Sequence, residues 1–303
     1  MKDQTIYPKN VFFLGKGGVG KSTSSSLTSL KLAQNKQKTL LVSMDPAHNQ
    51  SDIFERRFSE KPYAVNEYLS VIEVDTHKWV NTYLEDMQNQ VKRTYSYLTA
   101  FNLEKYLDIL KFSPGIEEYA LLLAYQNIRQ KAGDASYIIF DMPPTALTLK
   151  FLNLPDLSLI WLNNLLQLRQ KILDKKDIVS RVRFGRKELE TDKIKSKLLQ
   201  QIKMYEQMKS VFKDPEKTIL NLVLNTDKLS FNESQLIVNK LEKFGISINN
   251  IFLNKYYDGF DISTIKNMYP DYGLQILPQN NEALIGLNSL NAYLEKLDNF
   301  IEL

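Results

Sequence analysis

The chain of 303 residues contains no cysteine. This absence excludes disulfides, thiolate metal sites, iron–sulfur clusters and thiol nucleophiles, and it fits a reducing compartment. Long apolar runs are also missing. Residues 119–125 form one of the longest, well short of the roughly 18 residues that a membrane-spanning helix needs. Residues 1–10 are polar and show no signal peptide, so we expect a cytoplasmic protein.

The chain has little net charge, since 39 Lys and Arg face 35 Asp and Glu, a balance of +4. Its charge is uneven, however. Residues 169–203 contain 12 basic and 5 acidic side chains and carry +7, whereas the rest of the chain carries −3. Such runs are usually solvated helix faces. The functional alternative is contact with an acidic partner, a membrane receptor or an anionic membrane surface. Nucleic acid is not expected, because no platform of base-stacking aromatics accompanies the charges.

Short apolar runs alternate with helical patterns along the chain. Strand-like runs occur at residues 10–14, 39–43, 71–74, 137–140, 218–224, 248–253 and 274–277. Helical patterns cover residues 24–35, 78–131 and a long region that we expect to begin after Pro155. This alternation predicts an α/β fold with a doubly wound, mostly parallel sheet. We expect one P-loop NTPase-type domain over residues 1–303, with a helical subdomain formed by residues 78–131 and 156–213.

The clearest motif follows the first apolar run. Gly15, four further residues and then Gly20-Lys21-Ser22 match the P-loop pattern G-x-x-x-x-G-K-[ST] in a strand–loop–helix setting. In such loops the backbone N–H groups cradle phosphates, the lysine contacts the β- and γ-phosphates, and the hydroxyl ligates Mg²⁺. A glycine-rich turn is the alternative. The motif predicts that ATP and Mg²⁺ are bound by Gly15, Lys16, Gly17, Gly18, Val19, Gly20, Lys21, Ser22 and Thr23.

A second lysine, Lys16, lies inside the loop, and residues 16–23 read KGGVGKST. This run resembles the deviant Walker A motif of the dimeric ATPases that include partition and septum-placement proteins, the nitrogenase iron protein and the arsenite-pump ATPase. The resemblance implies that Lys16 reaches the nucleotide held by a partner subunit, like an arginine finger supplied in trans. It therefore implies a homodimer as the catalytic unit. Otherwise Lys16 is an exposed loop charge.

Two further segments resemble switches of the arsenite-pump and tail-anchored-protein-targeting ATPase family. Residues 45–52 read DPAHNQSD and resemble switch I, which implies that Asp45 orients the attacking water and belongs to the metal site together with Ser22 and Asp141. A cap for the following turn is the alternative. Residues 141–155 resemble switch II and imply that Asp141 is the Walker B carboxylate acting on Mg²⁺. Pro143 and residues 146–147 replace the alanine and glycine usual there, and hydrolysis is expected to survive both changes.

The resemblance extends over most of the chain. Residues 113–118 are similar to the family's P-G-I-D-E element, and residues 223–233 to a strand followed by a helix-opening serine and glutamate. Asn254 matches the asparagine that reads adenine, whose N6/N7 edge an amide can satisfy by donating and accepting together. Pro278 falls where the adenine loop carries a proline.

The family implies an ATP-hydrolysing homodimeric switch that shields tail-anchored or other hydrophobic membrane-protein segments. Residues 95–112, 119–128 and 157–168 are candidate client-binding helices, and burial in the subdomain core is the alternative. Two other functions stay open, the catalytic subunit of an arsenite efflux pump and a partition-type ATPase. Without cysteine the chain lacks both the pump's thiol site and the Cys-x-x-Cys zinc clasp of many targeting dimers. We therefore expect no zinc and a dimer held by packing and ATP.

Overall fold

The computed structural model describes residues 8–94, 113, 115–184, 192–297 and 300. Eight strands form one sheet in the order β3-β4-β2-β5-β1-β6-β7-β8. Neighbouring strands run parallel except β3 and β4. The α/β fold predicted from the sequence is confirmed. The strands are β1 (Lys9–Leu14), β2 (Thr39–Ser43), β3 (Tyr63–Ala64), β4 (Leu69–Glu73), β5 (Tyr137–Asp141), β6 (Thr218–Asn225), β7 (Asn250–Tyr256) and β8 (Gly273–Pro278).

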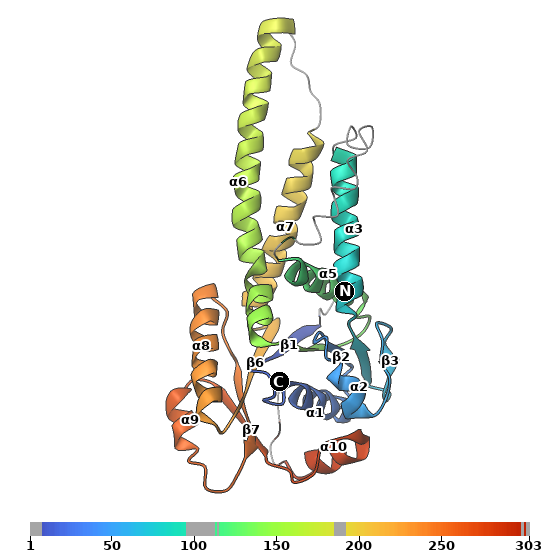
Figure 1. The fold of residues 1–303 in the computed structure, drawn as a ribbon, viewed down its shortest axis with the longest axis vertical. Coiled ribbons are helices and arrows are strands. Elements are labelled where there is room, and N and C mark those ends of the chain that lie inside the picture. Colours follow the sequence, from blue (N-terminus) through green and yellow to red (C-terminus); the bar gives the residue numbers. More distant parts are fainter. Residues whose placement is uncertain (1–7, 95–112, 114, 185–191, 298–299, 301–303) are drawn as a thin grey trace, which may run out of the picture. The chain divides into compact units, whose positions relative to one another are not determined.

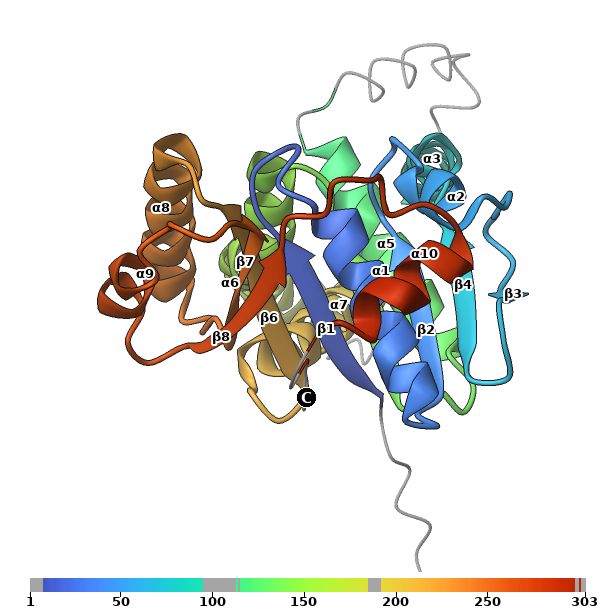
Figure 2. The ribbon, with the colours of Figure 1, turned by 90° about the horizontal axis from the view of Figure 1, so that it is seen from below.

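Helices alternate with these strands and cover both faces of the sheet. In Figure 2, α1 and α10 face the viewer, whereas α5 lies behind the sheet. The helices labelled in Figure 1 are α1 (Lys21–Gln34), α2 (Asn49–Phe54), α3 (Thr76–Thr94), α5 (Ile116–Lys131), α6 (Thr145–Phe184), α7 (Lys193–Lys213), α8 (Lys228–Phe244), α9 (Ser263–Met268) and α10 (Gly286–Leu294).

The central strands are apolar on both sides because helices cover both faces of a parallel sheet. All five residues of β2 are buried, as are the last five of β1. Phe12 of β1 stacks on Phe140 of β5, with ring centroids 4.9 Å apart. The parallel register aligns Phe13 of β1 and Ser43 of β2 with Asp141 of β5. The carboxyl ends of the three strands therefore meet at one edge, where ligands bind in open α/β sheets.

Two elements of the structure depart from the sequence prediction. The long helix does not begin after Pro155 but at Thr145, and it runs through the proline. A proline inside a helix lacks the N–H that the carbonyl four residues earlier would accept, here that of Phe151, and costs about 3 kcal/mol. The edge strand β3 was not predicted, because two exposed residues carry no apolar pattern.

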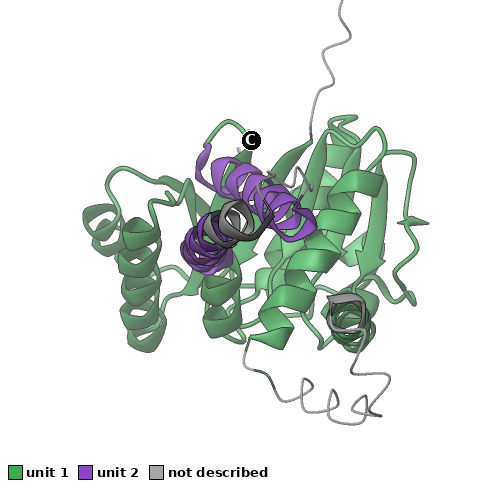
Figure 3. Cartoon of the chain, turned by 90° about the horizontal axis from the view of Figure 1, so that it is seen from above, with its two compact units in different colours: residues 1–151, 215–303 green, residues 152–214 purple. Residues whose placement is uncertain are grey.

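The chain forms two compact units (Figure 3). One comprises residues 1–151 and 215–303, and the other residues 152–214. In the first, α3 packs against α5, and the rings of Tyr83 and Tyr119 stack with centroids 5.4 Å apart. In the second, Arg169 donates to Asp192, whose carboxylate also caps α7 by accepting from the backbone N–H of Ile194. The predicted division into one domain and a helical subdomain stays a prediction, and residues 95–112 lie outside the described residues.

Among the residues that the structure describes, no helix is long and apolar enough to cross a membrane.

Candidate functional site

The glycine-rich loop between β1 and α1 is packed too tightly for side chains at two positions. Gly15 has a φ of +150°, and a Cβ there would lie 2.3 Å from the carbonyl oxygen of Val223. Gly20 has a φ of +96°, and its Cβ would lie 2.2 Å from the amide nitrogen of Asn254. Gly20 caps α1 without a side-chain hydrogen bond. The N–H groups of the first helical turn therefore face the loop, as an anion site requires.

Lys21 is the first residue of α1 and is almost completely buried. Its ammonium donates to the backbone carbonyl of Lys16 at 3.3 Å. Burial lowers the pKa of Lys21, and the nearby carboxylates of Asp141, Asp45 and Glu233 oppose that shift. The buried ammonium is thus held among three carboxylates at the phosphate loop.

Lys16 is half-buried at the start of the same loop. Across the described part of the chain, its side chain has neither a hydrogen bond nor an ion pair. Gly17 and Gly18, which follow it, are exposed, whereas Val19 is buried. Lys16 is therefore a partly accessible charge that the described residues leave without a side-chain partner.

Asp141 ends β5 and has no exposed surface. Burial raises the pKa of Asp141 to about 6, although hydrogen bonds from Ser22 and Gln50 and the charge of Lys21 act in the opposite direction. Its Oδ2 accepts from the Gln50 amide at 2.9 Å. Its Oδ1 has no partner of normal hydrogen-bond geometry among the described residues. A buried carboxylate oxygen without a hydrogen bond, on a carboxyl group that also interacts with Ser22, fits the oxygen donors that Mg²⁺ prefers.

Asp45 follows β2 and is buried at the edge of the site. Its Oδ1 accepts from the backbone N–H of Ala47 at 3.0 Å, and its backbone carbonyl accepts from that of His48. Asp45 therefore caps the turn, as the alternative interpretation expects, while its charge acts on Lys21. The two roles are compatible, because a turn cap uses one carboxylate oxygen.

The sequence did not single out two buried polar residues, Gln50 and Glu73. Gln50 in α2 contacts the P-loop helix and Asp141. Glu73 ends β4, and its carboxylate accepts from the backbone N–H of Ser51 at 2.8 Å and from the Ser51 hydroxyl at 2.7 Å. The available signal for Glu73 was an acidic residue at the carboxyl end of a buried strand. Gln50 lies within the DPAHNQSD run but carries no role from that resemblance.

Switch II forms the first turns of α6. The hydroxyl of Thr145 donates to Glu233 at 3.2 Å, and that of Thr148 donates to the Pro143 carbonyl at 2.7 Å. Residues 146–147, where the family usually has a glycine, are helical. Lys150 forms an ion pair at 2.8 Å with Glu118, which is buried at the start of α5. Switch II is therefore tied to Glu118, the last residue of the element formed by residues 113–118.

The remaining predicted site residues lie on β7, β8 and the start of α1. The Asn254 amide donates to the Val19 carbonyl at 2.7 Å, so the structure places Asn254 against the phosphate loop. Pro278 ends β8, and its carbonyl accepts from the Tyr293 hydroxyl at 2.6 Å. Thr23 is half-buried in α1. The adenine-binding roles of Asn254 and Pro278 stay predictions.

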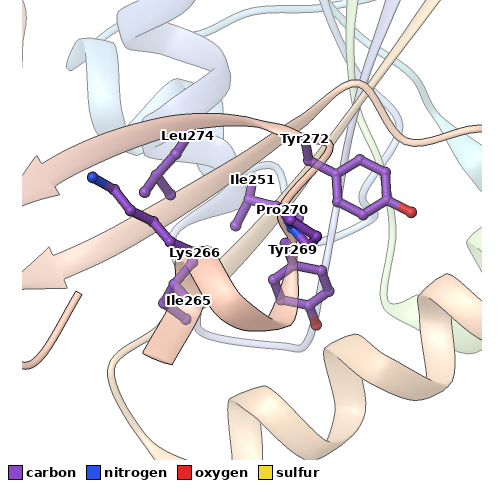
Figure 4. Close-up of a pocket in the computed structure, with 7 residues that line it drawn as sticks. All are labelled: Ile251, Ile265, Lys266, Tyr269, Pro270, Tyr272 and Leu274. Atoms are coloured by element: carbon purple, nitrogen blue, oxygen red, sulfur yellow. The ribbon is translucent and has the colours of Figure 1, made fainter. Parts of the chain in front are cut away.

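Two of the cavities in the described part of the chain lie beside the sheet, and neither is lined by phosphate-loop residues. One of about 310 Å³ is lined by Tyr269 and Tyr272, together with Ile251 and Leu274 near the amino ends of β7 and β8 (Figure 4). The Tyr269 hydroxyl forms a hydrogen bond with the hydroxyl of Ser234. The other, of about 1110 Å³, borders switch I at His48. The P-loop follows the carboxyl end of β1, and β1, β6, β7 and β8 run parallel. The first cavity, near the amino ends of β7 and β8, therefore lies at the other end of the strands from the P-loop.

Comparison with known proteins gives a family and several relatives. The anion-transporting ATPase family matches residues 8–268. An ATPase ASNA1 homolog of Cryptosporidium parvum is 31% identical over 298 residues, which cover 97% of this chain and 76% of that protein. ATPase GET3A of Arabidopsis thaliana is 30% identical over 305 residues, which cover 95% of this chain and 83% of that protein. An ATPase ASNA1 homolog of Plasmodium vivax is 32% identical over 266 residues, which cover 84% of this chain and 65% of that protein.

These findings confirm the resemblance read from the P-loop and the two switches. The match begins at β1 and includes every strand of the sheet except β8. The relatives named above are all called ATPases. The chain therefore belongs to the anion-transporting ATPase family, that of the arsenite-pump and tail-anchored-protein-targeting enzymes, and is an ATPase.

Proposed function

We propose that this ATPase works as a homodimer that binds ATP and Mg²⁺ and shields hydrophobic membrane-protein segments. The observation that carries the client part is an exposed apolar stripe on α6. It consists of Leu157, Ile160, Trp161, Leu168 and Ile172. At 100° per helical residue, these side chains share an arc of about 120°. Large apolar side chains gathered on one exposed face mark an interaction site more often than scattered ones do.

The nucleotide part of the proposal assigns roles to the residues around the phosphate loop. Lys21 and the loop N–H groups hold the phosphates, and Ser22 and Asp141 hold Mg²⁺, which neutralises charge on the β- and γ-phosphates when bound. Asp45 orients the water that attacks the γ-phosphorus as the bond to the β-phosphate oxygen breaks. Asn254 and Pro278 contact adenine.

Lys16 acts across the dimer in this proposal. Its partial exposure and the lack of a side-chain hydrogen bond or ion pair within the described residues support a role toward a second subunit. We expect Lys16→Ala to lower kcat by about 10³-fold, the lower range for a charge supplied in trans, while ATP binding to each subunit persists. Light scattering with ADP, Mg²⁺ and a phosphate transition-state mimic measures the dimer. A wild-type protein that stays monomeric under these conditions would contradict the trans role.

The client part is tested by a matched pair of substitutions. Ile160 in the stripe is 62% exposed, and Leu236 on α8 is 61% exposed. We expect Ile160→Asp to reduce co-purification of a tail-anchored membrane protein severalfold and to leave ATP hydrolysis intact, while Leu236→Asp changes neither. The proposal would be contradicted if both variants co-purified equal amounts of the tail-anchored protein. It would also be contradicted if the wild type co-purified none in any nucleotide state.

The same preparation separates the alternative functions. Stimulation of hydrolysis by As(III) would indicate the arsenite pump, although the chain offers no thiol for that ion. ATP-dependent, salt-sensitive binding to DNA or to anionic vesicles would indicate a partition-type switch. Neutralising basic residues in 169–203 tests whether this segment contacts an acidic surface or receptor. Its residues 185–191 lie outside the described part of the chain.

A further inference from the structure

Gln50 lies at the start of α2 and has no exposed surface. Its amide nitrogen donates to Asp141 Oδ2 at 2.9 Å and lies 3.1 Å from the hydroxyl of Ser25 and 3.2 Å from the backbone carbonyl of Ser22. Its amide oxygen accepts from the Ser26 hydroxyl at 2.6 Å. Both ends of the side chain are therefore used, as a buried amide requires to offset its loss of hydration.

These contacts join three segments that are far apart in sequence. Gln50 belongs to switch I, Ser22 and its neighbours open α1 behind the phosphate loop, and Asp141 ends β5. The residues on either side of Gln50 also take part. Asn49 donates to the Ser22 hydroxyl at 3.4 Å, and Ser51 is bound by the Glu73 carboxylate. Within this short helix, Gln50 is the residue that contacts the Walker B position.

The hydrogen bond from Gln50 determines how the Asp141 carboxylate is oriented. An amide N–H that donates to Oδ2 occupies one oxygen and fixes the rotation of the carboxylate. The other oxygen, Oδ1, is buried and has no hydrogen-bond partner among the described residues. A carboxylate that was free to rotate would present either oxygen and would lose conformational entropy when it met a cation.

We propose that Gln50 is a positioning residue for the magnesium site, which turns Oδ1 of Asp141 toward the metal and ties switch I to that carboxylate. This inference rests on the proposed role of Asp141 toward Mg²⁺. It adds a residue from switch I to the surroundings of the site. Partners of this kind, which orient a ligand without touching the metal, typically contribute about 10- to 100-fold to metal affinity.

The test measures Mg²⁺ binding rather than activity alone. A fluorescent ADP analogue is bound to the purified full chain, and Mg²⁺ is titrated from an EDTA-treated start. We expect Gln50→Met, which keeps the length of the side chain but cannot donate, to raise the half-saturating Mg²⁺ concentration at least tenfold. Affinity for the analogue in EDTA stays within twofold. Ser29→Ala is the matched control, since Ser29 is buried in α1 and bonds only the Ser25 carbonyl in this region.

Further measurements keep the inference separate from the roles it rests on. Gln50→Leu repeats the titration if Gln50→Met does not fold. Asp141→Asn is measured alongside, and an unchanged Mg²⁺ dependence there would overturn the metal role of Asp141 itself. If Asp141→Asn shifts the titration and a folded Gln50 variant does not, the positioning role of Gln50 is wrong while the proposed function stands. A parallel loss of Mg²⁺ affinity, EDTA-state binding and melting temperature would indicate a merely structural role and would also overturn the inference.

Discussion

Replacing Gly15 with alanine should destabilise the whole sheet, whereas the same change two residues later should not. A Cβ on Gly15 would lie 2.3 Å from the Val223 carbonyl oxygen and 3.2 Å from a methyl carbon of Val19. The first neighbour is backbone of β6, which pairs with β1. It cannot rotate away as a side chain can. At Gly17 a Cβ would meet nothing within 4 Å, and its φ does not lie in the region that favours glycine.

The magnitude follows from two costs at Gly15. A side chain at a φ of +150° costs about 1–3 kcal/mol. Forcing an extra carbon into a packed site costs about another 1–3 kcal/mol. A loss near 4 kcal/mol is a large share of the 5–15 kcal/mol typical of a folded domain, and it corresponds to roughly a 6 °C fall in Tm for a chain of this size. Gly17→Ala should change stability by less than about 1 kcal/mol.

Thermal unfolding followed by circular dichroism measures the difference. Both variants are scanned at one rate and without nucleotide, because bound ligand adds its own stabilisation. Gly20→Ala serves as an intermediate case, since its Cβ would displace the Asn254 amide, which is the end of a side chain. Equal melting temperatures for Gly15→Ala and Gly17→Ala would refute the reasoning from the close approach of β6.

Three further predictions concern charged residues. Lys21→Ala should abolish ATP hydrolysis, and an unchanged rate would contradict the site assignment. A double-mutant cycle on Glu118 and Lys150 should give a small but measurable favourable coupling, because the lysine is exposed and solvent screens the pair; zero coupling would show that switch II is not held there. Burial raises the pKa of Asp156, but hydrogen bonds from Lys209 and Lys213 outweigh it, so the pKa is lowered. Asp156→Asn should therefore reduce resistance to urea at pH 7. The difference should start to shrink near the ordinary aspartate pKa of about 4 and vanish only once the pH lies below the lowered pKa of the folded state; a difference that persists at still lower pH would argue against the ion pairs.

Much of the nucleotide site could be predicted from local patterns. The P-loop is a continuous run, so its residues are brought together by the chain itself. Asp45 and Asp141 each follow an apolar run, and parallel strands bring their carboxyl ends to one edge. The family match confirmed the resemblance that these runs suggested. The roles of individual residues stay predictions, because neither the match nor the geometry measures what each side chain does with a nucleotide.

Other features depend on packing between distant segments and have no local signature. Pro155 signals a helix end, yet it lies inside α6, because helix formation on both sides outweighs one lost hydrogen bond. Asn254 was chosen for adenine, but its amide also holds the carbonyl of Val19, 235 residues away. No spacing in the sequence reports this contact, since it depends on the order of β1, β6 and β7 in the sheet.

The sequence by itself determined that this protein has a P-loop and a mostly parallel sheet, because both follow from short runs of residue types. It also limited the metal chemistry, since a chain without cysteine offers no thiolate. Only the tertiary structure decided which polar residues surround the Walker B carboxylate. Gln50 and Asp141 are 91 positions apart and meet because β2 and β5 are neighbours. A buried amide finds its partner through the strand order, and strand order is a property of the whole fold.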